Sequence, residues 1–154
     1  MFNLLFIIVL VVLDQGFKYL ATKFLVDIVP VTLIPNLLGF NYVHNYGAGF
    51  SILSGKVDFL IIFTAVALLV IAYFVFAKKF DTETDELCFV LILAGGIGNL
   101  IDRVVNGYVV DYLEFLFIEF PIFNFADILI CVGVGLFALY TIKTEFFSKT
   151  KGDK

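Results

Sequence analysis

The stretch FLIIFTAVALLVIAYFVFA, residues 59–77, decides the fold because it contains no charged side chain. A helix needs ~20 apolar residues, at ~1.5 Å each, to cross the hydrocarbon core of a bilayer. The stretch is therefore predicted to span a membrane. The whole chain has the same character: its 154 residues are 62% hydrophobic and 16% charged, with a mean hydropathy of +1.06. Such a composition is typical of membrane proteins.

Three further apolar segments of similar length occur at 2–24, 87–105 and 123–142. The sequence thus predicts a membrane all-α protein, a four-transmembrane-helix bundle that forms one integral membrane domain over residues 1–154. The first segment lacks a basic leading region and a small-x-small cleavage site, so we interpret it as a retained helix. Residues 26–57 contain Pro30 and Pro35 among strand-forming residues, which predicts a small β-rich lobe on the outer membrane surface.

Lysines set the expected orientation. One group lies between the second and third segments and another follows the fourth, which places all of them on one side of a four-span chain: Lys78, Lys79, Lys143, Lys149, Lys151 and Lys154. The positive-inside rule makes that side cytoplasmic, so both termini are expected inside and the loops 26–57 and 106–122 outside. The formal net charge of −4 and the lack of a basic stripe argue against a nucleic-acid partner.

The cysteines and the histidine offer little chemistry. Cys88 and Cys131 each lie in an apolar run and are expected to be small buried hydrophobic residues. His44 is the only histidine, and no ligand cluster surrounds it, so neither a metal site nor a cofactor is expected. Serine catalysis is disfavoured. The candidate nucleophiles are Ser51 and Ser54 and the candidate bases are His44 and Lys56, but these residues lie in no recognised catalytic arrangement.

Charged residues within predicted spans are costly and are usually paired or functional. Asp14 and Lys18 are four residues apart on the first helix, so they share a face on which they can pair. A structural ion pair is the favoured interpretation, and a direct chemical role for Lys18 is the alternative.

The third segment ends in GGIGNLIDRVV, in which Asn99, Asp102 and Arg103 share one helix face. Arg103 could hold Asp102 or a carbonyl group, or it could contact a polar substrate, and the sequence leaves both roles open. The preceding glycines remove side chains where another helix or a ligand must come close: Gly95, Gly96 and Gly98.

Two acids, Asp111 in VVDY and Asp127 in FNFAD, follow on the same predicted membrane side. Asn124 can be a helix N-cap, which makes Asp127 the N3 residue, and Asp127 alone could be an acid stabilised by the helix dipole. Two carboxylates brought together cannot both ionise cheaply, so they share a proton and titrate as a unit. One can then take a proton from water while the other donates one to a carbonyl group, as in an aspartic protease. Because the helix N-terminus favours ionised Asp127, Asp111 is the expected proton carrier.

Five motifs, in order, make the chain resemble the bacterial lipoprotein signal peptidases (signal peptidase II): DQGFKY at 14–19, NYGAGFS at 45–51, GGIGNLIDR at 95–103, GYVVDY at 107–112 and FNFAD at 123–127. The resemblance implies an aspartic endopeptidase of the bacterial cytoplasmic (inner) membrane with its active site at the outer face. Such an enzyme removes the signal peptide from a prolipoprotein, just before a diacylglyceryl-modified cysteine.

The resemblance also implies roles for individual residues. Asp111 and Asp127 match the catalytic pair. The positions that match the substrate and inhibitor pocket are Asn45, Asn99, Arg103 and Asn124, and those that match supporting positions are Asp14, Lys18 and Asp102. Membrane lipid and globomycin-type peptide inhibitors are further implied partners. One departure is Gly49, where the family more often has alanine.

Two other classes of function compete with this one. A small proton- or cation-coupled transporter could use Asp14, Asp102 and Asp127 as a relay. The clustering of these acids in the outer halves of the spans and the lack of an inverted repeat argue against it. A non-catalytic membrane assembly factor, with charges paired only for structure, is the third hypothesis.

Overall fold

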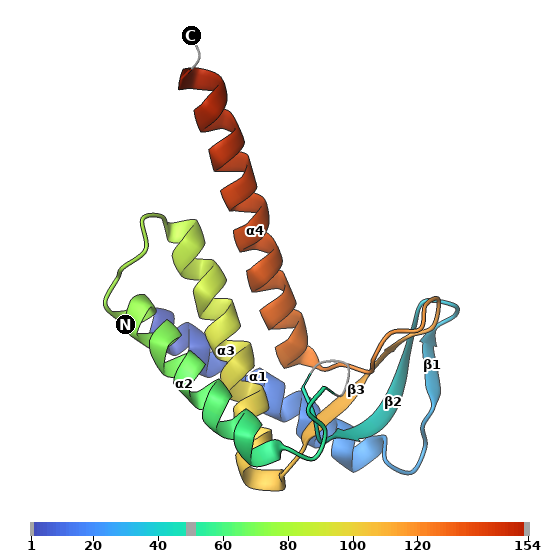
Figure 1. Ribbon diagram of the computed structural model, residues 1–154. Helices are drawn as coiled ribbons and strands as arrows, with labels where there is room; N and C mark the ends of the chain where they lie inside the picture. Colours follow the sequence, from blue (N-terminus) through green and yellow to red (C-terminus); the bar gives the residue numbers. More distant parts are fainter. Residues whose placement is uncertain (1, 49–51, 153–154) are drawn as a thin grey trace.

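A computed structural model describes residues 2–48 and 52–152, with side chains as far as residue 144. Four apolar helices form the molecule together with a small three-stranded sheet (Figure 1). The helices are α1 (Phe2–Phe24), α2 (Val57–Phe76), α3 (Glu83–Asn106) and α4 (Phe125–Gly152), and the strands are β1 (Val31–Ile34), β2 (Leu38–Asn45) and β3 (Val109–Phe115). Gly49 and Ser51 lie outside the described residues.

All four helices are long and apolar enough to cross a membrane. Many large apolar side chains on them face outward; Leu69 of α2 is 70% exposed and Val105 of α3 is 73% exposed. In water such surfaces would be costly, whereas in a bilayer they face lipid. The same reasoning corrects one expectation: Cys88 is buried, but Cys131 is exposed on α4. An apolar run in a membrane helix does not predict which of its residues face protein.

Glycines allow α3 to contact three helices closely, as the sequence predicted. A Cβ atom added at Gly95 would overlap the Ala126 carbonyl oxygen of α4, and one at Gly98 would overlap the Asp14 carboxylate of α1. A Cβ at Gly96 would overlap Leu68 of α2. Helix α3 is therefore the centre of the bundle, which explains why half of its apolar span is buried whereas only 17% of the α2 span is.

The ends of two helices follow from their caps. Helix α3 begins four residues before the predicted span, because the Thr82 side chain accepts a hydrogen bond from the Asp85 backbone N–H at 3.1 Å. It ends at Asn106, and the next residue, Gly107, caps the helix with a φ of 78°, a conformation that favours glycine. Helix α4 begins at Phe125, after the cap residue Asn124.

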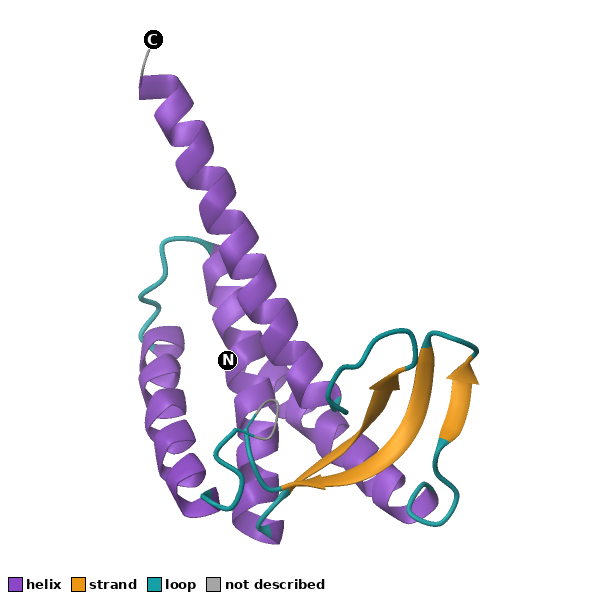
Figure 2. Cartoon of the chain, turned by 45° about the vertical axis from the view of Figure 1, so that its right-hand side comes forward, coloured by secondary structure: helices purple, strands orange, loops and turns teal. Residues whose placement is uncertain are grey.

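The sheet has the order β1-β2-β3 and is antiparallel throughout. Strands β1 and β2 come from the 26–57 loop, as expected, but β3 comes from the connection between α3 and α4, where no strand was predicted. Asp111 lies on β3 opposite Val43 of β2. Figures 1 and 2 show the sheet at the end of the bundle where α4 begins, far from the α2–α3 connection. The sheet thus brings one predicted catalytic acid toward the start of α4, which carries the other.

Candidate active site

Asp111 and Asp127 line one cavity of about 630 Å³. Asp111 is 2% exposed on β3, and Asp127 is half-buried in the first turn of α4. The wall is largely apolar, with a few polar groups among residues from β2, α3, β3 and α4. Two of the polar residues, Asn99 and Arg103, come from the last turns of α3. An apolar cavity with a few convergent polar groups is the usual form of a ligand site.

Asn124 contacts both acids. Its side-chain Nδ2 donates to Asp111 Oδ1 at 2.6 Å, and its backbone N–H donates to Asp127 Oδ2 at 3.1 Å. Its Oδ1 in turn accepts from the Asp127 backbone N–H at 3.0 Å. This reciprocal pattern is a capping box, which confirms the predicted N-cap and N3 positions. The start of α4 therefore holds Asp127 and reaches Asp111 at the same time.

Two more asparagine amides complete the support of the acids. Asn45, at the end of β2, donates to Asp111 Oδ2 at 2.9 Å, and Asn99 donates to Asp127 Oδ1 at 2.8 Å. All four carboxylate oxygens thus accept a hydrogen bond from an amide or a backbone N–H. Neutral donors fix the carboxylates in place without supplying a full positive charge.

The environment favours a proton on Asp111. Burial raises the pKa of Asp111 to about 7, and the negative charge of Asp127 acts in the same direction. The hydrogen bonds from Asn45 and Asn124 oppose this shift. A buried acid beside a second acid, with a pKa near neutrality, is suited to donate a proton during hydrolysis.

Arg103 lies at the edge of the cavity and holds carbonyl groups, one of the two roles that the sequence left open. It donates to the Gly47 carbonyl oxygen at 2.9 Å and to the Asn99 carbonyl oxygen at 3.4 Å. The first contact ties α3 to the segment after β2, where Gly47 also donates its N–H to Asn45 Oδ1 at 2.9 Å. Arg103 therefore supports the Asn45 amide that holds Asp111, and it also lines the cavity.

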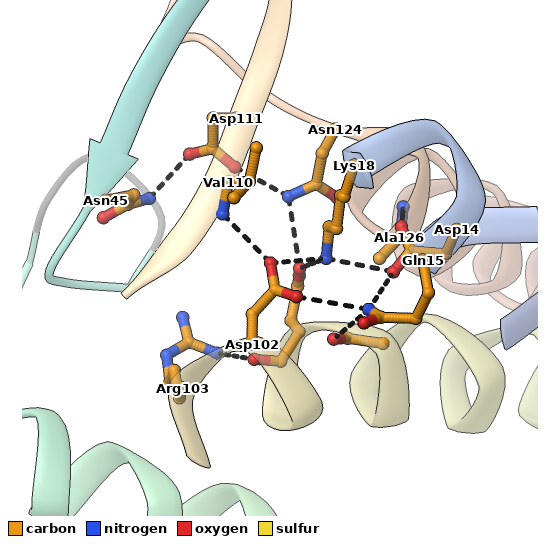
Figure 3. Close-up of polar contacts among 12 residues, drawn as sticks. Asp14, Gln15, Lys18, Asn45, Asp102, Arg103, Val110, Asp111, Asn124 and Ala126 are labelled. Carbon is orange, nitrogen blue, oxygen red and sulfur yellow. Dashed lines mark hydrogen bonds and ion pairs between the residues drawn. The ribbon is translucent and has the colours of Figure 1, made fainter. Parts of the chain in front are cut away.

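The supporting residues Asp14, Lys18 and Asp102 form a buried polar cluster near Asp111 (Figure 3). Lys18 pairs with Asp14 at 3.0 Å, which confirms the predicted pair, and also with Asp102 at 3.2 Å. Gln15 was missed by the sequence reasoning: it donates to Asp14, to Asp102 and to the Gly98 carbonyl oxygen. The signal that could have found it is its position, a polar residue inside a span and next to a charged one.

The residues considered for serine catalysis have other surroundings. His44 Nε2 lies 3.1 Å from the Tyr42 hydroxyl, and its ring stacks on Tyr108 with centroids 3.8 Å apart. Ser54 borders the cavity, and Ser51 is one of the residues left undescribed. These aromatic contacts give His44 a packing role in the sheet.

In comparisons with known proteins, residues 6–143 match the family model described as signal peptidase (SPase) II. A lipoprotein signal peptidase of Caldicellulosiruptor bescii is 43% identical over 91% of this chain and 92% of its own length. One of Clostridium tetani is 35% identical, with 97% of each chain covered.

Two solved structures of bacterial membrane enzymes are also similar to this chain. A bacterial membrane enzyme structure obtained by the in meso method at 2.3 Å superposes with a TM-score of 0.82 and 32% identity, covering 92% of this chain and 87% of the other. A second, at 1.9 Å, gives a TM-score of 0.81 and 33% identity, with 92% of each chain covered. Neither the transporter nor the assembly-factor hypothesis gains support from these relatives. The chain belongs to the signal peptidase (SPase) II family.

Proposed function

We propose that this protein is a membrane aspartic endopeptidase that removes the signal peptide from prolipoproteins, cleaving before a diacylglyceryl-modified cysteine, with Asp111 and Asp127 as its catalytic pair. One observation carries the proposal: the two carboxylates line the same cavity and are both bound by Asn124. Family membership supplies the reaction class, and this geometry supplies two acids that can share one proton.

The two acids have different tasks in the proposed reaction. Ionised Asp127 is the half-buried member and takes a proton from the attacking water. Asp111, with its pKa raised to about 7, carries the shared proton and gives it to the scissile carbonyl oxygen. Water then adds to the carbonyl carbon, and the proton held by Asp127 passes to the leaving amine as the C–N bond breaks. The carbonyl re-forms and returns its proton to Asp111, so one proton remains on the pair for the next cycle.

Three of the four proposed substrate-binding residues line the cavity: Asn45, Asn99 and Arg103. The fourth, Asn124, is fully buried. The side-chain amides of Asn45, Asn99 and Asn124 each donate to one of the acids. In our proposal all three orient the carboxylates, and Asn45 and Asn99, which line the cavity, also contact the peptide. Arg103 donates to two backbone carbonyls, and a guanidinium group has five N–H donors, enough to bind a peptide carbonyl as well. The apolar part of the wall suits the neighbouring hydrophobic residues of a signal peptide.

We further propose that the whole chain is one integral domain of the bacterial cytoplasmic membrane, with the cavity at the outer face and both termini in the cytoplasm. Lys78 and Lys79 support this orientation, since they lie in the α2–α3 connection, at the end of the bundle away from the sheet (Figure 1). A lipid-anchored cysteine would hold the scissile bond near that outer surface. The lipid itself and globomycin-type peptides are the proposed further partners.

The test is cleavage of a diacylglyceryl-modified peptide beside its unmodified twin, with and without globomycin. We expect cleavage of the modified peptide only, inhibited by globomycin. Asp111→Asn and Asp127→Asn should each lower kcat by about 10²–10⁴-fold, the usual contribution of an acid or base.

The matched control is Glu114→Gln, since Glu114 lies on the same strand as Asp111 and bonds only Asn41 among the described side chains. It should leave kcat unchanged. If either variant of the catalytic dyad, Asp111→Asn or Asp127→Asn, cleaves the modified peptide at the wild-type rate while remaining folded, the catalytic assignment is wrong.

A further inference from the structure

Two buried carboxylates bind the backbone immediately before the two proposed catalytic acids. Asp14 Oδ1 accepts the Ala126 N–H at 3.0 Å, one residue before Asp127. Asp102 Oδ2 accepts the Val110 N–H at 3.0 Å, one residue before Asp111. The first contact is made from α1 and the second from α3, so each fixes one acid-bearing segment to the bundle.

One ammonium group joins these two contacts. Lys18 Nζ lies 3.0 Å from Asp14 Oδ2 and 3.2 Å from Asp102 Oδ2. Its third partner is Asn99 Oδ1, at 2.9 Å. Lys18 is only 3% exposed, and an ammonium group has three N–H donors, so these three acceptors match its full capacity. Figure 3 shows the Lys18 ammonium between the side chains of Asp14 and Asp102.

The third contact also orients an amide. Because an ammonium group only donates, Asn99 must turn its oxygen toward Lys18, and its NH₂ group then faces Asp127 Oδ1 at 2.8 Å. Asn124 Nδ2 donates to the same Asn99 oxygen at 3.1 Å while it donates to Asp111. Lys18 thus determines the direction of the hydrogen bonds that end on both acids.

We propose that Lys18 is a positioning residue that sets Asp111 and Asp127 relative to one another, through the Asp14 and Asp102 contacts and through the Asn99 amide. The inference rests on the proposed function, because it assigns a task to Lys18 within that dyad. Lys18 makes no hydrogen bond or ion pair to either acid among the described contacts, so it positions the acids through the groups that it binds. Its positive charge also lowers the pKa of Asp111, against the larger effect of burial.

A comparison with Gln15 shows what the Lys18 ammonium adds to the cluster. Gln15 Nε2 also bridges Asp14 and Asp102, at 3.1 and 3.2 Å, so these two carboxylates are cross-linked twice. Gln15 bonds none of the amides that hold Asp111 or Asp127 among the described contacts; its third acceptor is the Gly98 carbonyl oxygen. Both cross-links hold the two carboxylates that bind the Ala126 and Val110 N–H groups, but only the one through Lys18 also contacts an amide that donates to one of the acids.

The test separates positioning from folding. Lys18→Met alone leaves two buried carboxylates without a counter-charge and is expected to weaken the fold. We therefore add Lys18→Met/Asp102→Asn, which removes one positive and one negative charge and leaves the net charge of the cluster unchanged. In this double variant the amide introduced by Asp102→Asn retains an oxygen that can accept the Val110 N–H.

We expect the double variant to fold in detergent and to show a kcat lowered about 100-fold, the size of effect that a displacement of ~1 Å at an active site causes. KM should stay within about twofold. The control is Asn3→Leu, which breaks the Asn3–Glu86 hydrogen bond, also between α1 and α3 but near the other ends of these helices. It should lower the thermal midpoint and leave kcat unchanged.

A folded double variant with the wild-type kcat would overturn the proposal, and so would a loss of activity that lies entirely in KM. If neither Lys18 variant folds, the proposal also fails, because Lys18 would then act by holding the bundle together. Asp111→Asn and Asp127→Asn are assayed in parallel. If they remain active, the proposed function fails; if they are inactive while both Lys18 variants keep full activity, only this inference fails.

Discussion

Asp14 and Asp102 share an ammonium group, whereas Asp111 and Asp127 are held by amides and backbone N–H groups. Within residues 2–48 and 52–144, the ion pairs of the structure are the two that Lys18 makes. A carboxylate beside a cation is fixed in place by its partner. In our proposal the two carboxylates held by neutral donors share a proton, because both cannot ionise cheaply side by side. In our proposal the same residue type is therefore structural in the first pair and catalytic in the second, and the hydrogen-bond or ion-pair partners of each pair decide its role.

The largest expected difference between the two pairs is in stability, which can be measured in variants of each pair. Asp102→Ala leaves Lys18 with one carboxylate and the Val110 N–H without its acceptor. We expect a loss of about 3–5 kcal/mol in the free energy of unfolding, as for other broken buried ion pairs. Asp111→Asn should cost no stability at neutral pH. Denaturant unfolding in detergent measures both.

The control for Asp102→Ala is Asp81→Ala, since Asp81 is exposed in the α2–α3 connection. Its effect should stay within about 0.5 kcal/mol. A larger loss of stability for Asp111→Asn than for Asp102→Ala would reverse the roles of the two pairs.

A second prediction concerns the contact that brings Asp14 against α3. Gly98→Ala places a methyl group against the Asp14 carboxylate, so Asp14 must leave the Ala126 N–H or α1 must move. We expect a destabilisation of about 1–3 kcal/mol, typical of overpacking. Gly135→Ala is the matched control: it lies within α4 with nothing within 4 Å of an added Cβ, and it should be neutral or stabilise by up to about 1 kcal/mol. Equal effects of the two substitutions would contradict the close packing.

A third prediction concerns pH. In our proposal the pair needs its proton for cleavage. Because the pKa of Asp111 is raised to about 7, kcat should fall above about pH 7, by up to about tenfold for each pH unit. The free energy of unfolding should also fall as the pH rises. In the unfolded chain the Asp111 carboxyl ionises near its ordinary pKa of 3.8, while in the fold it stays protonated to about 7. The contribution of Asp111 to stability therefore declines progressively between these values, and the decline is complete above about pH 7.

The measurement is the thermal midpoint of wild type and Asp111→Asn at about pH 4 and about pH 8. The advantage of the asparagine variant should be larger at the higher pH. A kcat that stays constant to about pH 9 would show that the pair does not lose its proton near neutrality.

The smallest expected effect concerns the cavity wall. Cys131 is exposed and lines the cavity one helical turn after Asp127, whereas Cys88 is buried. A small maleimide should label Cys131 and not Cys88, and a bound globomycin-type peptide should slow the labelling. Cys131→Ser should change kcat by less than about twofold, because no proposed proton transfer involves the thiol. Labelling of Cys131 that is unaffected by the peptide would remove it from the binding region.

The sequence predicted the elements that local pattern controls. The charge-free stretch 59–77 indicated a span, Asn124 indicated a helix start, and the spacing of Asp14 and Lys18 indicated their pair; the structure confirms each. Strand β3 was not predicted, because VVDYLEF becomes a strand only by pairing with β2, which lies far away in the sequence.

The candidate site shows the same limit. Carboxylate and amide residues could be named from their motifs, but the binding of the Ala126 and Val110 N–H groups by Asp14 and Asp102 could not. Those contacts join segments from different helices and strands, and no local spacing encodes them. The predicted burial of Cys131 was wrong for a related reason: an apolar run does not show which of its residues line a cavity.

The most direct test of the shared proton is infrared titration of the enzyme with isotope-labelled aspartate, in wild type, Asp111→Asn and Asp127→Asn. We expect wild type to show a protonated carboxyl band at about pH 6 that disappears as the pH rises through about 7. The band should be absent from Asp111→Asn. Two fully ionised carboxylates in wild type at about pH 6, or a band that persists in Asp111→Asn, would contradict the claim that Asp111 holds the proton.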